Sequence, residues 1–257
     1  AIVWQDRRTS EFCSNLKKEG LEREINKKTG LLLDPYFSSS KISWLLENVN
    51  GLRNLANKGD VCFGTVDSWL IWNLTNGDTF ATDYTNASRT SLFNIQTLKW
   101  DDELLSIFDI PLQSLPEVRN SNDYFGETKL LSKKLKITGV IGDQQSSAFG
   151  QSCYQSGDVK STYGTGCFLL ANTGKEIIYS KKKLLTTISY KINDDLSYAL
   201  EGSIFMAGGI MNWLKLNLGI LDNVSDSSKI ASSVDPSSKV VLVPAFSGLG
   251  APHWSAE

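Results

Sequence analysis

The spacing of apolar residues changes near residue 151, and this change constrains the fold more than any other feature of the chain. Before residue 151, helical segments alternate with short strand-like runs; Ile42, Leu45 and Leu46, for example, fall on one face of an expected helix. After it, short β-runs follow one another, separated by turns. We therefore expect a mixed α/β chain built from two units, residues 1–151 and 152–257, with a hinge between them.

Individual elements follow from the same patterns. The expected helices cover residues 10–28, 40–49 and 203–219, with a further short helix within residues 62–77 that ends at the Asn76-Gly77 turn. The expected strands cover residues 1–5 and 239–246, with a strand and then a turn over 30–40, and hairpins over 157–174 and 184–202. Trp69 and Trp72 recur at helical spacing, so they are interpreted as core residues.

Composition excludes several classes of function. The net charge is −2 and the Lys and Arg residues are scattered, which argues against a nucleic-acid surface. No apolar run approaches the roughly 20 residues that span a bilayer, so we expect no membrane insertion. The four cysteines have no CxxC spacing, which predicts neither a zinc site nor a disulfide framework. Reduced thiols indicate a cytoplasmic protein.

A lone carboxylate, Asp143, lies where a strand-like run ends and a helix of small residues begins, in the stretch VIGDQQSSAFGQ. The start of a helix carries a partial positive charge, which favours a carboxylate at this position. Two interpretations stay open. Asp143 either caps the helix or acts as a general base held near the hydroxyl of a substrate.

Two glycine-rich segments follow Asp143. In Gly164-Thr165-Gly166, between two β-runs, the backbone can point several N–H groups at one anion while Thr165 offers a hydroxyl; the alternative is an ordinary hairpin turn. Gly208 and Gly209 lie just inside an expected helix, where each glycine costs roughly 1 kcal/mol relative to alanine. A nucleotide lying against these glycines would explain them, and so would tight helix packing.

Seven stretches, taken in order, resemble the FGGY family of carbohydrate kinases and, within it, the glycerol kinases. They are IVWQDRRT, DPYFSSSKISWLL, FGTVDSWLIW, TDYTNASRTSLFNI, GDQQSSAFGQ, STYGTGCFLLANTG and PAFSGLGAPHW. The similarity extends over essentially all 257 residues. It implies a two-domain, actin/hexokinase-like (ribonuclease H-like) α/β fold that closes over ATP and glycerol. Residues 1–151 would be the C-terminal part of the polyol-binding domain, and residues 152–257 the first part of the nucleotide-binding domain.

The resemblance also implies a reaction and the residues that bind its polyol. The reaction is the ATP-dependent phosphorylation of glycerol to sn-glycerol 3-phosphate. Asp143 would be the base that accepts the proton of the attacking hydroxyl, and Gln144 would help to hold glycerol. Tyr36 would form a hydrogen bond with a glycerol hydroxyl. Trp4 and Phe168 would form an apolar wall against its carbon backbone.

The nucleotide side of the site is implied in the same way. Thr165 would contact the phosphates and Gly208 the nucleotide. Asn212 stands where the family commonly has Gln, and its shorter amide would weaken that nucleotide contact. Mg²⁺ would bridge the phosphates of ATP, and no residue of this chain is assigned as a metal ligand.

The ends of the chain raise the question of its length. It begins with Ala1 rather than Met, within an expected strand, and it stops within a loop signal. We expect a central piece of a longer kinase, truncated at both ends and inactive by itself, that forms part of a possible homo-oligomer in the full-length protein. The alternatives are another FGGY kinase acting on a polyol or ketose, and a truncated remnant without catalytic activity.

Overall fold

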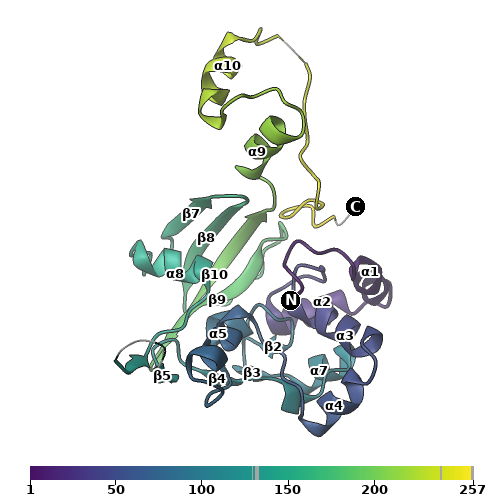
Figure 1. Cartoon of the computed structure of the whole chain (residues 1–257), viewed down its shortest axis with the longest axis vertical. Coiled ribbons are helices and arrows are strands. Elements are labelled where there is room, and N and C mark those ends of the chain that lie inside the picture. The colour runs from purple at the N-terminus through teal and green to yellow at the C-terminus, as the bar shows by residue number, and fades with distance from the viewer. Residues whose placement is uncertain (129, 131–132, 238, 256–257) are drawn as a thin grey trace.

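The computed structural model describes residues 1–128, 130, 133–237 and 239–255, and it shows two parts that are built differently (Figure 1). Short helices dominate the first part, whereas an antiparallel sheet dominates the second. In the described part of the chain, no helix is both long enough and apolar enough to cross a bilayer. The helices before the sheet are α1 (Ser10–Lys18), α2 (Glu22–Thr29), α3 (Ser38–Asn48), α4 (Leu52–Lys58), α5 (Val66–Leu74), α6 (Tyr84–Ala87), α7 (Asp102–Phe108), the 3₁₀ turn η1 (Leu112–Ser114) and α8 (Asp143–Gly150).

The sheet of the second part supports both glycine-rich segments. Its order is β7-β8-β10-β9, and each neighbouring pair is antiparallel. The strands are β7 (Val159–Tyr163), β8 (Cys167–Gly174), β9 (Leu185–Ile192) and β10 (Asp195–Ile204). The register pairs Lys160 of β7 with Leu170 of β8, and Leu170 with Glu201 of β10. These three buried residues therefore form one row across the sheet.

Three short pairings complete the strands of the described residues. A parallel pairing joins β1 (Ala81–Asp83) to β4 (Glu117–Arg119), and antiparallel pairings join β2 (Phe93–Asn94) to β3 (Lys99–Trp100) and β5 (Gly126–Thr128) to β6 (Leu135–Ile137). After the sheet, α9 (Gly209–Leu216), the 3₁₀ turn η2 (Val224–Asp226) and α10 (Ser227–Ser233) project beyond it (Figure 1). The last segment then returns toward the N-terminal part.

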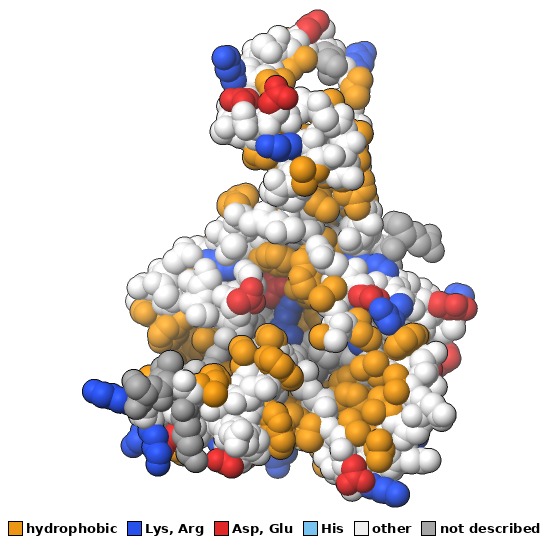
Figure 2. Space-filling model, viewed as in Figure 1, with side chains coloured by type: hydrophobic (Ala, Val, Ile, Leu, Met, Phe, Trp, Pro, Cys, Tyr) orange, Lys and Arg blue, Asp and Glu red, His pale blue; other side chains and the backbone are white. Residues whose placement is uncertain are grey.

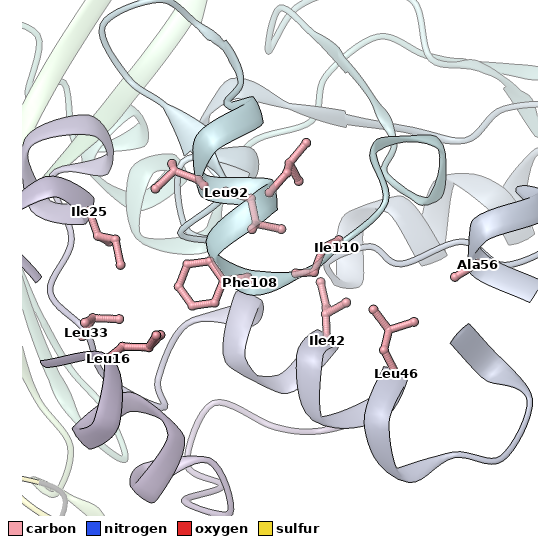
Figure 3. Close-up of a cluster of buried hydrophobic side chains, with 11 residues drawn as sticks. Leu16, Ile25, Leu33, Ile42, Leu46, Ala56, Leu92, Phe108 and Ile110 are labelled. Atoms are coloured by element: carbon pink, nitrogen blue, oxygen red, sulfur yellow. The ribbon is translucent and has the colours of Figure 1, made fainter. Parts of the chain in front are cut away.

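The helices of the first part close over one apolar core. Side chains from α1, α2, α3 and α7 point toward a common interior, where Phe108 lies between Ile25 and Ile42 in the view of Figure 3. Phe108 is only 1% exposed. The amphipathic spacing of these helices explains this core, because residues three and four apart lie on the same face.

A second apolar cluster joins segments that are far apart in the chain. Phe37, at the start of α3, packs with Leu185 of β9, Phe205 after β10 and Trp254 near the end of the chain. The Trp254 ring lies 6.3 Å from that of Phe37, and its Nε1 donates to the carbonyl of Lys183 at 2.7 Å. This cluster packs the first part of the chain against the sheet and the returning C-terminal segment.

Three expected strands are absent from the structure. Residues 1–5 form a turn, residues 31–34 form bends and irregular backbone, and the described residues of 239–246 contain one isolated bridge residue, Phe246, but no strand. A strand needs a neighbouring strand to accept and donate its backbone hydrogen bonds, and within the described residues no strand pairs with any of these segments. Val240 and Val241 are accordingly 91% and 82% exposed.

The helix predictions were more successful but not complete. The helix expected over residues 10–28 is divided into α1 and α2 around Gly20, whose φ of +83° is not helical. The short helix before Asn76-Gly77 is present as α5. The interpretation of Trp69 and Trp72 as core residues was wrong, because they are 64% and 44% exposed and α5 turns Ile71 inward instead.

Replacing Phe108 with alanine tests the helical core. We expect Phe108→Ala to lower the free energy of unfolding by about 3–5 kcal/mol, because it removes a buried ring and leaves a cavity. Urea unfolding followed by tryptophan fluorescence measures the change. Leu112→Ala is the control, since that side chain is 50% exposed, and it should change the free energy of unfolding by no more than about 0.5 kcal/mol. Equal effects of the two variants would contradict this account of the core.

Candidate active site

Asp143 is the first residue of α8, and its side chain is exposed. Gly142 occupies the N-cap position, and among the described residues no backbone N–H donates to the Asp143 carboxylate. Instead, Nε2 of Gln144 donates to Oδ2 of Asp143 at 2.9 Å. Helix capping, one of the two interpretations of the sequence, is therefore wrong. The carboxylate lies exposed at the positive end of the helix.

Hydrogen bonds anchor the backbone just before Asp143 to the segment of β1 and α6. The N–H of Gly142 donates to Oγ1 of Thr85 at 2.7 Å, and the Thr85 hydroxyl lies 2.8 Å from both carboxylate oxygens of Asp83. Asp83 is fully buried and also accepts hydrogen bonds from Ser121 and from the backbone and side-chain amides of Asn86. Because a buried carboxylate must keep its donors, this network fixes the start of α8.

Three of the predicted site residues form an aromatic cluster. The Trp4 ring lies 5.6 Å from Tyr36 and 6.0 Å from Phe168, edge to face in both cases. Phe205 completes the cluster at 5.6 Å from Trp4 and 5.5 Å from Tyr36. The four residues come from the N-terminal turn, the loop before α3, β8 and the segment after β10. The fold therefore brings Trp4, Tyr36 and Phe168 together, as the resemblance implied.

Tyr36 is coupled electrostatically to Asp143. Burial, together with the negative charges of Glu201 and Asp143, raises the pKa of Tyr36 to about 12, and the charge of Arg89 opposes this shift. The Tyr36 hydroxyl thus stays protonated at neutral pH and can donate a hydrogen bond. The fold also links the carboxylate to the aromatic cluster, because α8, which begins at Asp143, packs on β8, the strand that carries Phe168.

A buried ion pair lies beneath the cluster. Nη2 of Arg89, after α6, lies 2.8 Å from Oε1 of Glu201 in β10, whose side chain is only 1% exposed. Ser203 donates to the same oxygen at 2.7 Å, and the Arg89 guanidinium lies 5.4 Å from the centre of the Phe37 ring. Burial acts to lower the pKa of Arg89, but the interactions with Glu201 and Tyr36 together outweigh it, and the pKa is raised. Arg89 and Glu201 therefore join the two parts of the chain as a charged pair.

The two glycine-rich segments touch each other. The N–H of Gly208 donates to the carbonyl of Gly164 at 2.9 Å, and the N–H of Gly209 donates to that of Thr165 at 3.2 Å. A Cβ atom added to Gly208 would lie 2.7 Å from the Gly164 oxygen, so only glycine fits there. Tight packing thus explains Gly208, while the exposed Thr165 side chain is left at the surface. Both segments contribute to one glycine-rich surface.

Asn212 is the predicted site residue with the least support from the structure. It lies exposed on α9, in the segment that projects beyond the sheet (Figure 1). Within the described residues, no hydrogen bond joins Asn212 to the other predicted site residues. The remaining predicted residues are linked, because Phe168 belongs to the strand that follows the turn carrying Thr165, and α8 packs on β7 and β8. Near the middle of the face in Figure 2, acidic and basic side chains lie beside apolar ones.

Four residues of this region were missed in the sequence. They are Lys160, Glu201, Arg89 and Phe205. Lys160 and Glu201 are single charges within β-runs, but the apolar residues that alternate with them, such as Val159 and Leu200, predict that these charges face outward, so the pattern itself hid them. Arg89 and Phe205 carry no signal either, because their partners are more than 100 residues away in the chain.

Comparison with known proteins identifies the relatives of the chain. The N-terminal domain of the FGGY family of carbohydrate kinases matches residues 1–150, and the C-terminal domain of the same family matches residues 159–257. Proteins named glycerol kinase from Paraburkholderia phytofirmans and Rhizobium meliloti are 56% and 54% identical to the whole chain. The chain spans 52% of the length of each, so it corresponds to about half of these relatives.

Solved structures agree with the sequence matches. A glycerol kinase from Plasmodium falciparum, solved with ADP, has a TM-score of 0.86 and 43% identity; the match covers the whole of this chain and 52% of that one. A xylulose kinase from Lactobacillus acidophilus has a TM-score of 0.81 at 23% identity, with 99% of this chain and 52% of that one covered. The second match, at its lower identity, shows only a common fold.

Removing Arg89 tests the buried ion pair. We expect Arg89→Met to lower the free energy of unfolding by about 3–5 kcal/mol, because it leaves the Glu201 carboxylate buried without its cation. Arg53→Met is the matched control, since Arg53 pairs with an Asp109 side chain that is 83% exposed, and its loss should cost at most about 1 kcal/mol. Urea unfolding measures both variants. An Arg89→Met protein as stable as the control variant would mean that the pair does not hold the two parts together.

Proposed function

Because the chain belongs to the FGGY family of carbohydrate kinases, we propose that the protein containing it transfers the γ-phosphoryl group of ATP to glycerol, forming sn-glycerol 3-phosphate. The observation that carries this proposal is the exposed carboxylate of Asp143, which caps no helix, at the start of a helix that packs on β8, the strand that carries Phe168 of the aromatic cluster. Relatives named glycerol kinase, at 54–56% identity over the whole chain, support the choice of substrate.

The fold agrees with this family. The prediction of an actin/hexokinase-like α/β fold is confirmed by the structural match to a glycerol kinase. The boundary near residue 151 stays a proposal; it is supported by the end of α8 at Gly150 and by the ranges over which the two family domains match. Since the chain spans about half the length of these relatives, the activity is proposed for the whole protein, and the inactivity of this chain alone stays a prediction.

The polyol would lie between Asp143 and the aromatic cluster. Asp143 would accept the proton of the attacking hydroxyl as the new O–P bond forms, and phosphoryl transfer needs mainly this positioning of the nucleophile. Gln144 and the protonated hydroxyl of Tyr36 would bind the other hydroxyls, because a polyol hydroxyl buried without a partner costs about 1–3 kcal/mol. Trp4 and Phe168 would cover the carbon backbone.

ATP would lie on the other side of Asp143, over the glycine-rich surface. Thr165 and the backbone of its turn would hold the phosphates, Gly208 would allow the nucleotide to approach closely, and Asn212 would contact it from α9. The described residues contain no group of three or more His, Cys, Asp or Glu that could hold a metal. We propose that Mg²⁺ arrives with ATP, since Mg²⁺ in such sites is bound largely by phosphates and water.

Two further properties of the whole protein are proposed. Use of ATP and four free cysteines support a cytoplasmic location. We keep a homo-oligomer of the full-length protein as a proposal that sedimentation can test. We propose no nucleic-acid partner, since acidic residues outnumber basic ones and the net charge is −2, whereas nucleic-acid-binding domains usually carry an excess of basic residues.

A substrate panel tests glycerol against the alternative polyols and ketoses. With MgATP and the whole protein, we expect kcat/KM for glycerol to exceed that for xylulose or ribulose by at least about 100-fold, because unfilled donors and acceptors in the site penalise the wrong substrate. A coupled assay of ADP release measures each rate. A ketose phosphorylated faster than glycerol would select another FGGY kinase. If no substrate is phosphorylated, the result would support the alternative of a remnant without catalytic activity.

Replacing the proposed base separates catalysis from folding. We expect Asp143→Asn to lower kcat by about 10²–10⁴-fold, because the amide cannot accept the proton of the hydroxyl. Binding of ADP and the midpoint of thermal unfolding should stay near those of the unmodified protein. Asp60→Asn, at an exposed residue away from the site, is the control and should leave kcat unchanged. Retention of full activity by Asp143→Asn would exclude its role as a base.

A further inference from the structure

Lys160 is a buried lysine within the second part of the chain. It is the second residue of β7, between the exposed Val159 and Ser161, and it is only 1% exposed itself. Burying a lysine is unfavourable unless its charge is used, because the ammonium group loses its hydration. An apolar side chain of similar length would fill the same position at lower cost. Lys160 therefore calls for an explanation beyond packing.

The Lys160 amine contacts the proposed catalytic group through one intermediate. Its Nζ donates to Oε1 of Gln144 at 2.5 Å, and Nε2 of Gln144 donates to Oδ2 of Asp143 at 2.9 Å. An ammonium group can only donate, so Gln144 must present its oxygen to Lys160 and its NH₂ group to Asp143. Without Lys160, the side-chain amide of Gln144 could turn over and place its oxygen against the carboxylate.

The charges around Lys160 agree with this arrangement. Burial lowers the pKa of Lys160, while the negative charges of Glu201 and Asp143 and the thiols of Cys153 and Cys167 oppose the shift. No carboxylate of the described residues lies within ion-pair distance of its amine. Within the described residues, the Lys160 side chain therefore donates one hydrogen bond, to the neutral amide of Gln144, and that amide in turn donates to Asp143.

We propose that Lys160 is a positioning residue, which holds Asp143 toward the substrate hydroxyl by fixing the amide of Gln144. This inference rests on the proposed function, in which Asp143 is the base. Lys160 lies behind Gln144 and does not itself contact substrate. The alternative is that Lys160 only balances the charge of Glu201, which stands in the same row of the sheet.

Kinetics of the whole protein distinguish these two roles. We expect Lys160→Met to lower kcat by about 10–100-fold, because a small displacement of a reacting group has an effect of this size. The KM for ATP, the affinity for ADP and the midpoint of thermal unfolding should change little. Lys175→Met, at an exposed lysine, is the matched control and should leave all of these values unchanged. An unaltered kcat in Lys160→Met would overturn the proposal.

A double-mutant cycle with Gln144 makes the test specific. If Lys160 acts through Gln144, then Lys160→Met should lower kcat by less than about threefold once Gln144→Ala is present. An effect as large as in the unmodified background would overturn the proposal in favour of the charge-balance role. If Lys160→Met does not fold, Lys160→Gln serves instead, because it is neutral and too short to keep the same contact. The same fall in kcat is expected of it, and an unchanged kcat would again overturn the proposal.

The same measurements separate this inference from the proposed function. If the unmodified protein does not phosphorylate glycerol with MgATP, the proposed function fails whatever Lys160 does. If the unmodified protein is active and Lys160→Met retains its kcat, only the positioning role fails.

Discussion

The buried ion pair between Arg89 and Glu201 is the contact on which the arrangement of the site depends. It joins the loop after α6 to β10, with 2.8 Å between the charged groups and the Glu201 side chain almost fully buried. Opening it would leave a charge without a partner in a poorly hydrated interior, which is strongly unfavourable. The pair therefore keeps the sheet in one position against the helical part. Tyr36, which contacts Arg89 through its ring and the sheet through Phe205, is held by the same arrangement.

Two separate hydrogen-bond systems then place Asp143. One acts on its backbone, through Gly142, Thr85 and the buried Asp83. The other acts on its side chain, through Gln144. A carboxylate that is fixed from both directions loses little further freedom when a ligand binds, and this lowers the entropic cost of reaching a reactive geometry. The exposed position of Asp143 is thus compatible with a precisely oriented carboxylate.

The sequence predicted those parts of the fold that are determined locally. Three such features depend only on residues that are close together in the sequence. They are the α5 helix with its end at Asn76-Gly77, the hairpin around Thr165, and the change of pattern near residue 151. The family resemblance supplied the aromatic residues of the site. The strands expected at residues 1–5 and 239–246 were wrong because strand formation requires a partner that local sequence does not reveal. For the same reason, neither the burial of a single charge such as Lys160 within a β-run nor its contact with Gln144 could be predicted.

Tight packing and ligand binding can both require glycine at Gly208, and the two requirements are compatible. Gly208 has no room for a Cβ atom because the Gly164 carbonyl lies against it, so its glycine is explained without a nucleotide. That contact, however, joins the start of α9 to the turn and leaves the Thr165 side chain exposed beside the joined backbones. A surface of backbone without side chains is what a phosphate group needs for close approach. The surface around Gly208 and the surroundings of Asp143 thus owe their shape to different interactions: backbone packing at Gly208 and a network of polar side chains at Asp143.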